Sequence, residues 1–219
     1  MSTLTKMART LFHAETPTVA PGVVPATITL PPPRTTGGLP LMEALALRRS
    51  GRSFDSRDIA PEILSDLLWS AFGVNRAEGH ERTAPSARDD QEIDVYAATR
   101  AGLWRYDAAG HRLLRVASID ARKVTGFQDF VDQAPLDLVY VARHRGLGAL
   151  APEKRMVYSA VSAGAIAENV YLYCAGAGLA TVVRGWFSEA ALAEALGLGN
   201  DQHVILAQTV GWPAVPAKS

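Results

Sequence analysis

The chain has 219 residues, 48% of them hydrophobic, and its 22 Lys and Arg residues balance its 22 Asp and Glu residues. This length suits one domain with a large core, and the zero net charge argues against a polyanionic partner such as a nucleic acid. No apolar run approaches the roughly 20 residues that span a bilayer and no signal core is present, so we expect a cytoplasmic protein with no membrane partner.

The first 40 residues are rich in Pro, Thr and Ala and differ from the rest of the chain. Residues 30–34 favour an extended polyproline conformation, and Gly37 with Gly38 forms a flexible joint. We therefore predict an extended arm over residues 1–40 and a single domain over residues 41–219. An arm that lies along its own domain or a partner subunit is favoured over a PxxP ligand.

Hydrophobic spacing predicts an α+β succession of elements after the arm. A helix begins at Leu41, and a second helix has Pro61 in its first turn and Gly73 beyond its end. Strands at residues 93–98, 103–106 and 112–116 form an antiparallel meander. The remaining expected elements are a central strand at 136–142, a helix from about 153 to 175, a strand near 181–183, a helix at 188–196 and a strand at 204–210. The helix at 153–175 is dense in small residues, which predicts a core element or a subunit contact.

Residues 48–54 place three arginines and two serines in seven positions at the end of the first helix. Guanidinium groups stay charged and donate in a fork, Ser50 adds a hydroxyl, and Gly51 lets the backbone approach a ligand closely. The pattern indicates a site for phosphate or another anion. The alternative is a helix C-terminus whose cations complement the helix dipole.

Several familiar sites are excluded by inspection of the sequence. It contains neither a GxxxxGK[ST] phosphate loop nor a GxSxG nucleophile, and its five histidines lack metal-ligand spacing. The single cysteine, Cys174, lies in an apolar helical run and is interpreted as a buried structural thiol. Residues 176–178 are interpreted as a helix cap, because a dinucleotide fingerprint would have to follow a strand and open a helix.

Six segments in order resemble the FMN-dependent nitroreductase family, and its SagB-type dehydrogenase branch most of all. They are residues 30–33, 48–54, 83–87, 132–136, 178–185 and 210–213, and the likeness covers about residues 28–213. The resemblance implies a three-layer α+β fold with a mainly antiparallel central sheet flanked by helices. It also implies an intertwined homodimer with two FMN sites in the subunit interface.

The same resemblance suggests which residues bind FMN. Arg48, Arg49 and Ser50 belong to the segment that meets the phosphate and ribityl chain, and Arg52 approaches the N1 and O2 edge of the flavin. A cation there stabilises the negative charge of the reduced ring. Gln128 matches a polar position that faces the pyrimidine, with a helix cap as the alternative role.

Two further segments complete the implied site. Arg184 and Gly185 match a stretch whose backbone donors face N5, with a surface strand position as the alternative for Arg184. The loop at residues 85–91 corresponds to one that reaches the flavin from the neighbouring subunit; its candidate ligands are Pro85, Ser86, Ala87 and Gln91. Asp89 stands where many relatives have asparagine, and Lys218 is a further candidate for the phosphate.

The function implied is ping-pong hydride transfer from NADH or NADPH, through flavin N5, to a small conjugated acceptor such as a nitroaromatic or a quinone. This chemistry requires no catalytic side chain and no metal. One alternative is the peptide-azoline dehydrogenase activity of the SagB-type branch, which uses a Lys-Tyr pair; no lysine of this chain precedes a tyrosine. Another is a flavin-binding protein without turnover.

Overall fold

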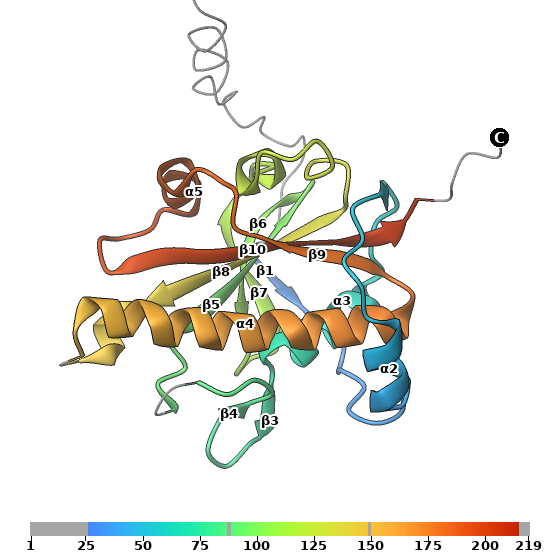
Figure 1. Cartoon of the computed structure of the whole chain (residues 1–219), viewed down its shortest axis with the longest axis horizontal. Coiled ribbons are helices and arrows are strands. Elements are labelled where there is room, and N and C mark those ends of the chain that lie inside the picture. Colours follow the sequence, from blue (N-terminus) through green and yellow to red (C-terminus); the bar gives the residue numbers. More distant parts are fainter. Residues whose placement is uncertain (1–25, 87–88, 149, 215–219) are drawn as a thin grey trace, which may run out of the picture.

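The computed structural model describes residues 26–86, 89–148 and 150–214, which form a three-layer α+β domain (Figure 1). An eight-stranded sheet lies in the middle. Helices α3 (Pro61–Phe72) and α4 (Pro152–Ala177) pack on one face of it, and α5 (Glu189–Leu196) packs on the other. The expected fold class is confirmed.

The described strands of this sheet pair only in the antiparallel sense. Their order is β1 (Thr27–Thr29), β7 (Arg112–Ala117), β6 (Gly102–Asp107), β5 (Ile93–Thr99), β8 (Leu136–Arg143), β10 (Gln202–Pro213) and β2 (Phe54–Asp55), with β9 (Ala180–Arg184) also on β10. The predicted meander is β5–β6–β7. A separate hairpin joins β3 (Val74–Arg76) to β4 (Glu81–Arg82), and neither strand of it was predicted.

The helices begin and end at the residues that their sequences indicate. Pro61 starts α3, Ser188 accepts a hydrogen bond from the Ala191 amide at the start of α5, and Gly178 ends α4 in the left-handed conformation with φ 70°. The helix-cap interpretation of residues 176–178 is therefore confirmed. The remaining helices are α2 (Leu41–Leu47) and the 3₁₀ turns η2 (Arg122–Thr125) and η3 (His144–Leu147).

Helix α4 crosses the sheet and forms much of the core (Figure 1). Ser162, Ala163 and Ala167 are buried on its inner face, where these small side chains let it approach the sheet closely. Cys174 is also buried, and burial raises the pKa of its thiol, as expected of a structural cysteine. The core interpretation of this helix is correct. Its outer face exposes apolar side chains, so the subunit contact stays a prediction.

Residues 26–40 of the expected arm lie against the domain. Strand β1 pairs with β7, and Leu30 is buried in the main core. Arg34 forms an ion pair with Asp66 of α3, with its Nε 2.7 Å from the carboxylate Oδ2. Residues 1–25, and the segment that contains Lys218, lie outside the described residues, so the division at residue 40 stays a prediction. None of the helices in the described ranges is long and apolar enough to cross a membrane.

Candidate functional site

The arginine segment connects α2 to β2 and lies against the edge strand β9. Arg48 caps α2, and its amide donates to the Ala44 carbonyl. The Gly51 amide donates to the Thr181 carbonyl at 2.9 Å. A Cβ atom on Gly51 would lie 2.9 Å from the Ala180 Cβ, so only glycine allows this close approach.

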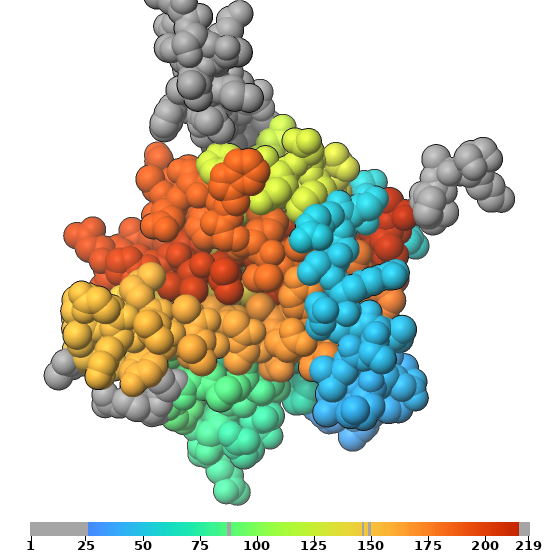
Figure 2. Space-filling view, viewed as in Figure 1, coloured from blue at the N-terminus to red at the C-terminus, as the bar shows by residue number. Residues whose placement is uncertain are grey.

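A cavity of about 600 Å³ opens beside this segment. It is lined by Arg48, Arg49 and Arg52, by the C-terminal turn of α4, by the start of β9 and by Pro213 and Ala214 at the end of β10. Figure 2 shows these parts of the chain as neighbours on one face of the molecule. No carboxylate among the described residues forms an ion pair with any of the three arginines. Their donors are therefore available to an anion.

Tyr171 of α4 connects the arginine segment to β9. Its hydroxyl shares a 2.8 Å hydrogen bond with the Ser50 Oγ and accepts one of 2.9 Å from the Val183 amide. The Arg48 guanidinium lies 5.3 Å from the centre of the tyrosine ring, at cation–π distance. Tyr171 could not be recognised as a site residue from the sequence, because helical spacing marks it only as a core position.

Arg184 is buried and forms an internal ion pair, so its interpretation as a surface strand residue is wrong. Its Nη2 lies 2.8 Å from the Asp137 Oδ1, and the two side chains are 2% and 0% exposed. Its Nε donates to the Thr209 hydroxyl and its Nη1 to the Thr125 carbonyl. The side chain therefore cannot bind a cofactor; only the backbone of Arg184 is left for that role.

Burial dominates the electrostatics of this ion pair. It raises the pKa of Asp137 to about 6, although Arg184 opposes the shift, and it lowers the pKa of Arg184. The Asp137 Oδ2 has no hydrogen-bond partner, which adds to the cost of ionising the carboxyl. Asp137 was also missed, because its partner stands 47 positions away in the sequence.

Gln128 lies next to this pair. Arg184 Nη1 donates to the Gln128 Oε1 over a long 3.4 Å, and Gln128 stands in a bend after η2. Its interpretation as a helix cap is therefore wrong. Gly126 leaves room for the guanidinium, since a Cβ there would collide with Arg184 Nη1. The ion pair thus fixes the loop that carries Gln128.

Gly185 is exposed at the end of β9, and a Cβ added there would meet no atom within 4 Å. The next residue, Trp186, is 61% exposed and lies with its ring centre 5.6 Å from that of Phe127. The Phe127 amide donates to the Trp186 carbonyl. Gly185 therefore borders an exposed aromatic surface.

The loop at residues 85–91 does not line the cavity beside the arginines. Ser86 Oγ accepts a hydrogen bond from the Gln91 amide at 3.0 Å, and Gln91 itself has a positive φ of 46°. Asp89 also has a positive φ, of 57°. Ala87 lies outside the described residues. Within one chain, the structure thus brings Arg48, Arg49, Ser50 and Arg52 together and leaves the loop candidates elsewhere.

Comparisons with known proteins identify the class. The model of the nitroreductase family matches residues 45–212. A nitroreductase-named protein of Methanocaldococcus jannaschii is 26% identical over 181 residues, which cover 78% of this chain and 90% of that protein. The crystal structure of a nitroreductase-named protein of Ralstonia eutropha is 50% identical with a TM-score of 0.87, and the match covers 91% of this chain and 95% of that one.

A more distant structure shares the fold alone. It is the NADPH:FMN oxidoreductase of Vibrio harveyi complexed with NAD+, which is 20% identical with a TM-score of 0.60; the match covers 82% of this chain and 71% of that one. The fold and the family match together define an oxidoreductase. The chain belongs to the nitroreductase family.

Proposed function

We propose that this protein is an FMN-dependent oxidoreductase that takes electrons from NADH or NADPH and passes them to a small conjugated acceptor. The observation that carries the proposal is the cavity beside residues 48–52, where three guanidinium groups have no carboxylate partner among the described residues. Family membership supports the same cofactor.

The residues around the cavity fit FMN in chemistry and in size. A volume of about 600 Å³ is in the range of cofactor sites. Arg48 and Arg49 supply charged donors for a phosphate, and the close contact between Gly51 and β9 gives the segment a fixed backbone. The exposed Trp186 and Phe127 rings beside Gly185 offer an apolar surface to a flat ring.

When bound, FMN supplies an acceptor for hydride at N5 and a donor to the second substrate. The chain supplies position and charge. Arg52 would place a cation that favours the reduced cofactor, while the buried ion pair of Asp137 with Arg184 fixes the backbone at the end of β9. Gly185 leaves space there, because a Cβ added at this position would meet no atom within 4 Å.

We also propose that the site is completed in a homodimer by the partner's copy of the loop at residues 85–91. Two observations support this assembly. The loop does not line the cavity of its own chain, and α2 and the outer face of α4 expose large apolar side chains. Those side chains are Leu41, Met42, Leu45, Leu47, Met156, Val157 and Val161.

Anaerobic mixing of the purified protein with NADH or NADPH tests this function. We expect the oxidised flavin band to bleach, and to recover when a quinone or a nitroaromatic is added. A protein that binds FMN but keeps its oxidised spectrum with both donors would be a flavin-binding protein without turnover. Oxidation of an azoline peptide, with no bleaching by either donor, would favour the SagB-type activity instead.

A further inference from the structure

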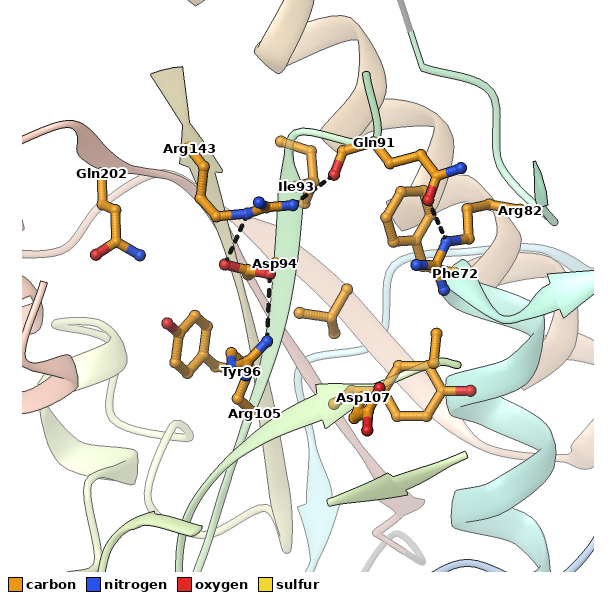
Figure 3. A pocket seen from close by; sticks show the side chains of 13 residues that line it. Phe72, Arg82, Gln91, Ile93, Asp94, Tyr96, Arg105, Asp107, Arg143 and Gln202 are labelled. Atoms are coloured by element: carbon orange, nitrogen blue, oxygen red, sulfur yellow. Dashed lines mark hydrogen bonds and ion pairs between the residues drawn. The ribbon is translucent and has the colours of Figure 1, made fainter. Parts of the chain in front are cut away.

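Strands β5 and β6 diverge and leave a second cavity inside the sheet. They pair only where residues 96–99 face residues 102–105. Beyond this point β5 continues along β8 as far as Ile93, while β6 continues along β7 as far as Asp107. The space between the diverging strands, about 370 Å³ in volume, is here named the fork pocket (Figure 3).

Three arginines line the fork pocket together with two carboxylates. Asp94 faces two of the arginines: its Oδ2 lies 3.0 Å from the Arg143 Nε, and its Oδ1 lies 3.8 Å from the Arg105 Nη1. Figure 3 shows Asp94 between these guanidinium groups. The other carboxylate, Asp107, forms a 2.7 Å ion pair with Arg112, which does not line the pocket. One carboxylate is thus left for three guanidinium groups.

Arg82 is the arginine of the pocket that forms no ion pair among the described residues, although Asp107 and Asp89 attract it from a distance. Its Nε donates to the Gln91 Oε1 at 2.8 Å, and its guanidinium lies 5.3 Å from the centre of the Phe72 ring. Its Nη1 is shielded from solvent and has no hydrogen-bond partner. None of the ion pairs of the described residues includes Arg82, and burial lowers the pKa of its guanidinium. A half-buried cation that forms no ion pair carries part of the cost of burying a charge, and an anion in the pocket would lower that cost.

We propose that the fork pocket binds a small oxyanion, a phosphate or a carboxylate group, through Arg82 and Arg105. Both groups accept two parallel hydrogen bonds from a guanidinium, so the pocket chemistry suits either source. The Gln202 and Tyr96 side chains add polar groups at the opposite side of the pocket. Asp94 pairs with both Arg105 and Arg143, so its single charge does not neutralise the three guanidinium groups of the pocket.

Anion binding is linked to the loop at residues 85–91. Gln91 is held by two of the same arginines, because Arg143 Nη2 also donates to its carbonyl, at 2.9 Å. The left-handed conformation of Gln91 depends on such contacts. An anion that binds Arg82 therefore competes with the hydrogen bond from Arg82 to the Gln91 Oε1. Anion binding weakens one of the contacts that position this loop. Any effect of the loop on a flavin of the partner subunit rests on the function proposed above, whereas the anion site does not.

Calorimetric titration of the purified full chain with inorganic phosphate, and separately with malonate, at constant ionic strength tests the site. We expect saturable binding of at least one of the two anions, and which of them binds identifies the source. Arg82→Gln and Arg105→Gln should each weaken binding at least about tenfold. Arg100→Gln is the matched control, since Arg100 is exposed, pairs with Asp58 and lies outside the pocket.

A second variant and a second readout separate this site from the one beside Arg48. Binding to the fork pocket should survive Arg48→Ala and should speed amide exchange at Gln91, because the anion competes for the Arg82 guanidinium that holds this residue. The proposal is overturned if neither anion binds saturably, if both pocket variants bind as tightly as the wild type, or if only Arg48→Ala abolishes binding. Failure of the protein to take up FMN would leave these expected results unchanged, so the two proposals fail separately.

Discussion

At the scale of single residues, Arg48 is the side chain on which the proposed phosphate site depends most. It is half-buried beside the Tyr171 ring, whereas Arg49 is exposed. We expect Arg48→Ala to weaken FMN binding by roughly 2 to 4 kcal/mol, because a partly buried charged contact is lost, and Arg49→Ala to weaken it less. Quenching of flavin fluorescence during titration measures both constants. Superimposable curves for the two variants would reject the assignment.

Asp137 is predicted to be essential for stability because it neutralises Arg184 inside the protein. Asp137→Ala would leave that guanidinium buried without a counter-ion, so we expect a loss of about 3 to 5 kcal/mol in the free energy of unfolding. Urea unfolding measures the loss. Asp58→Ala is the control, since the Asp58 side chain is 79% exposed and its ion pair contributes little. Equal midpoints for the two variants would show that the buried pair contributes nothing.

The residues found from sequence and those missed differ in how far apart their partners stand. Arg48, Ser50 and Arg52 lie within five positions, so their shared chemistry is visible in one segment. Asp137 and Tyr171 act through residues 47 and 121 positions away, and only the folded chain brings those partners together. Arg184 was found in the family motif, but its burial could not be predicted from local spacing.

At the scale of elements, the contact between the arginine segment and β9 is the feature that shapes the cavity. Gly51→Ala would place a methyl group 2.9 Å from the Ala180 Cβ, so the segment must move away from β9. We expect a loss of about 1 to 3 kcal/mol in unfolding free energy, and weaker FMN binding. Thermal unfolding and flavin titration measure these effects. Gly199→Ala is the control, because a Cβ there makes only ordinary contacts; unchanged behaviour of Gly51→Ala would contradict the account.

Long periodic elements were predictable and short ones were not. The apolar stripe of α3 and the turns of the meander β5–β6–β7 were clear in the sequence, and β8 was indicated by its continuous β-branched and aromatic run. Strands β2, β3 and β4 have only two or three residues each, which is too short for a hydrophobic period. They are defined by their pairing, β2 with β10 and β3 with β4. The C-terminal strand is longer than predicted, since its end pairs with β2 as well as β9.

At the scale of the whole molecule, the exposed apolar face of α4 predicts the subunit contact. Val161 is 66% exposed in the single chain, and a charge at this position would be buried in a dimer. We expect Val161→Glu to give a monomer with weakened FMN binding, as measured by sedimentation and flavin titration. Val116→Glu is the control, because Val116 is an exposed apolar residue on β7, away from this face. A Val161→Glu dimer of normal affinity would place the contact elsewhere.

The fold of the described residues followed from the six family segments, but the assembly could not be derived in the same way. The order of those segments fixes which elements meet within one chain, and the sheet confirms that order. The described residues of the loop at 85–91 do not line the cavity beside the arginines of their own chain. The role proposed for this loop depends on a second copy of the chain. Contacts within one chain do not determine where that second copy binds.

Complementation between two defective variants tests the shared site most directly. Arg48→Ala removes the proposed phosphate ligand, and Ser86→Trp disrupts the loop, so the proposed homodimer of either variant should bind FMN poorly. A mixed dimer isolated with two affinity tags would have one site with an intact arginine segment and an intact partner loop. We predict about one FMN per mixed dimer, bound with near wild-type affinity. A mixed dimer that binds no more FMN than its parents would contradict the shared site.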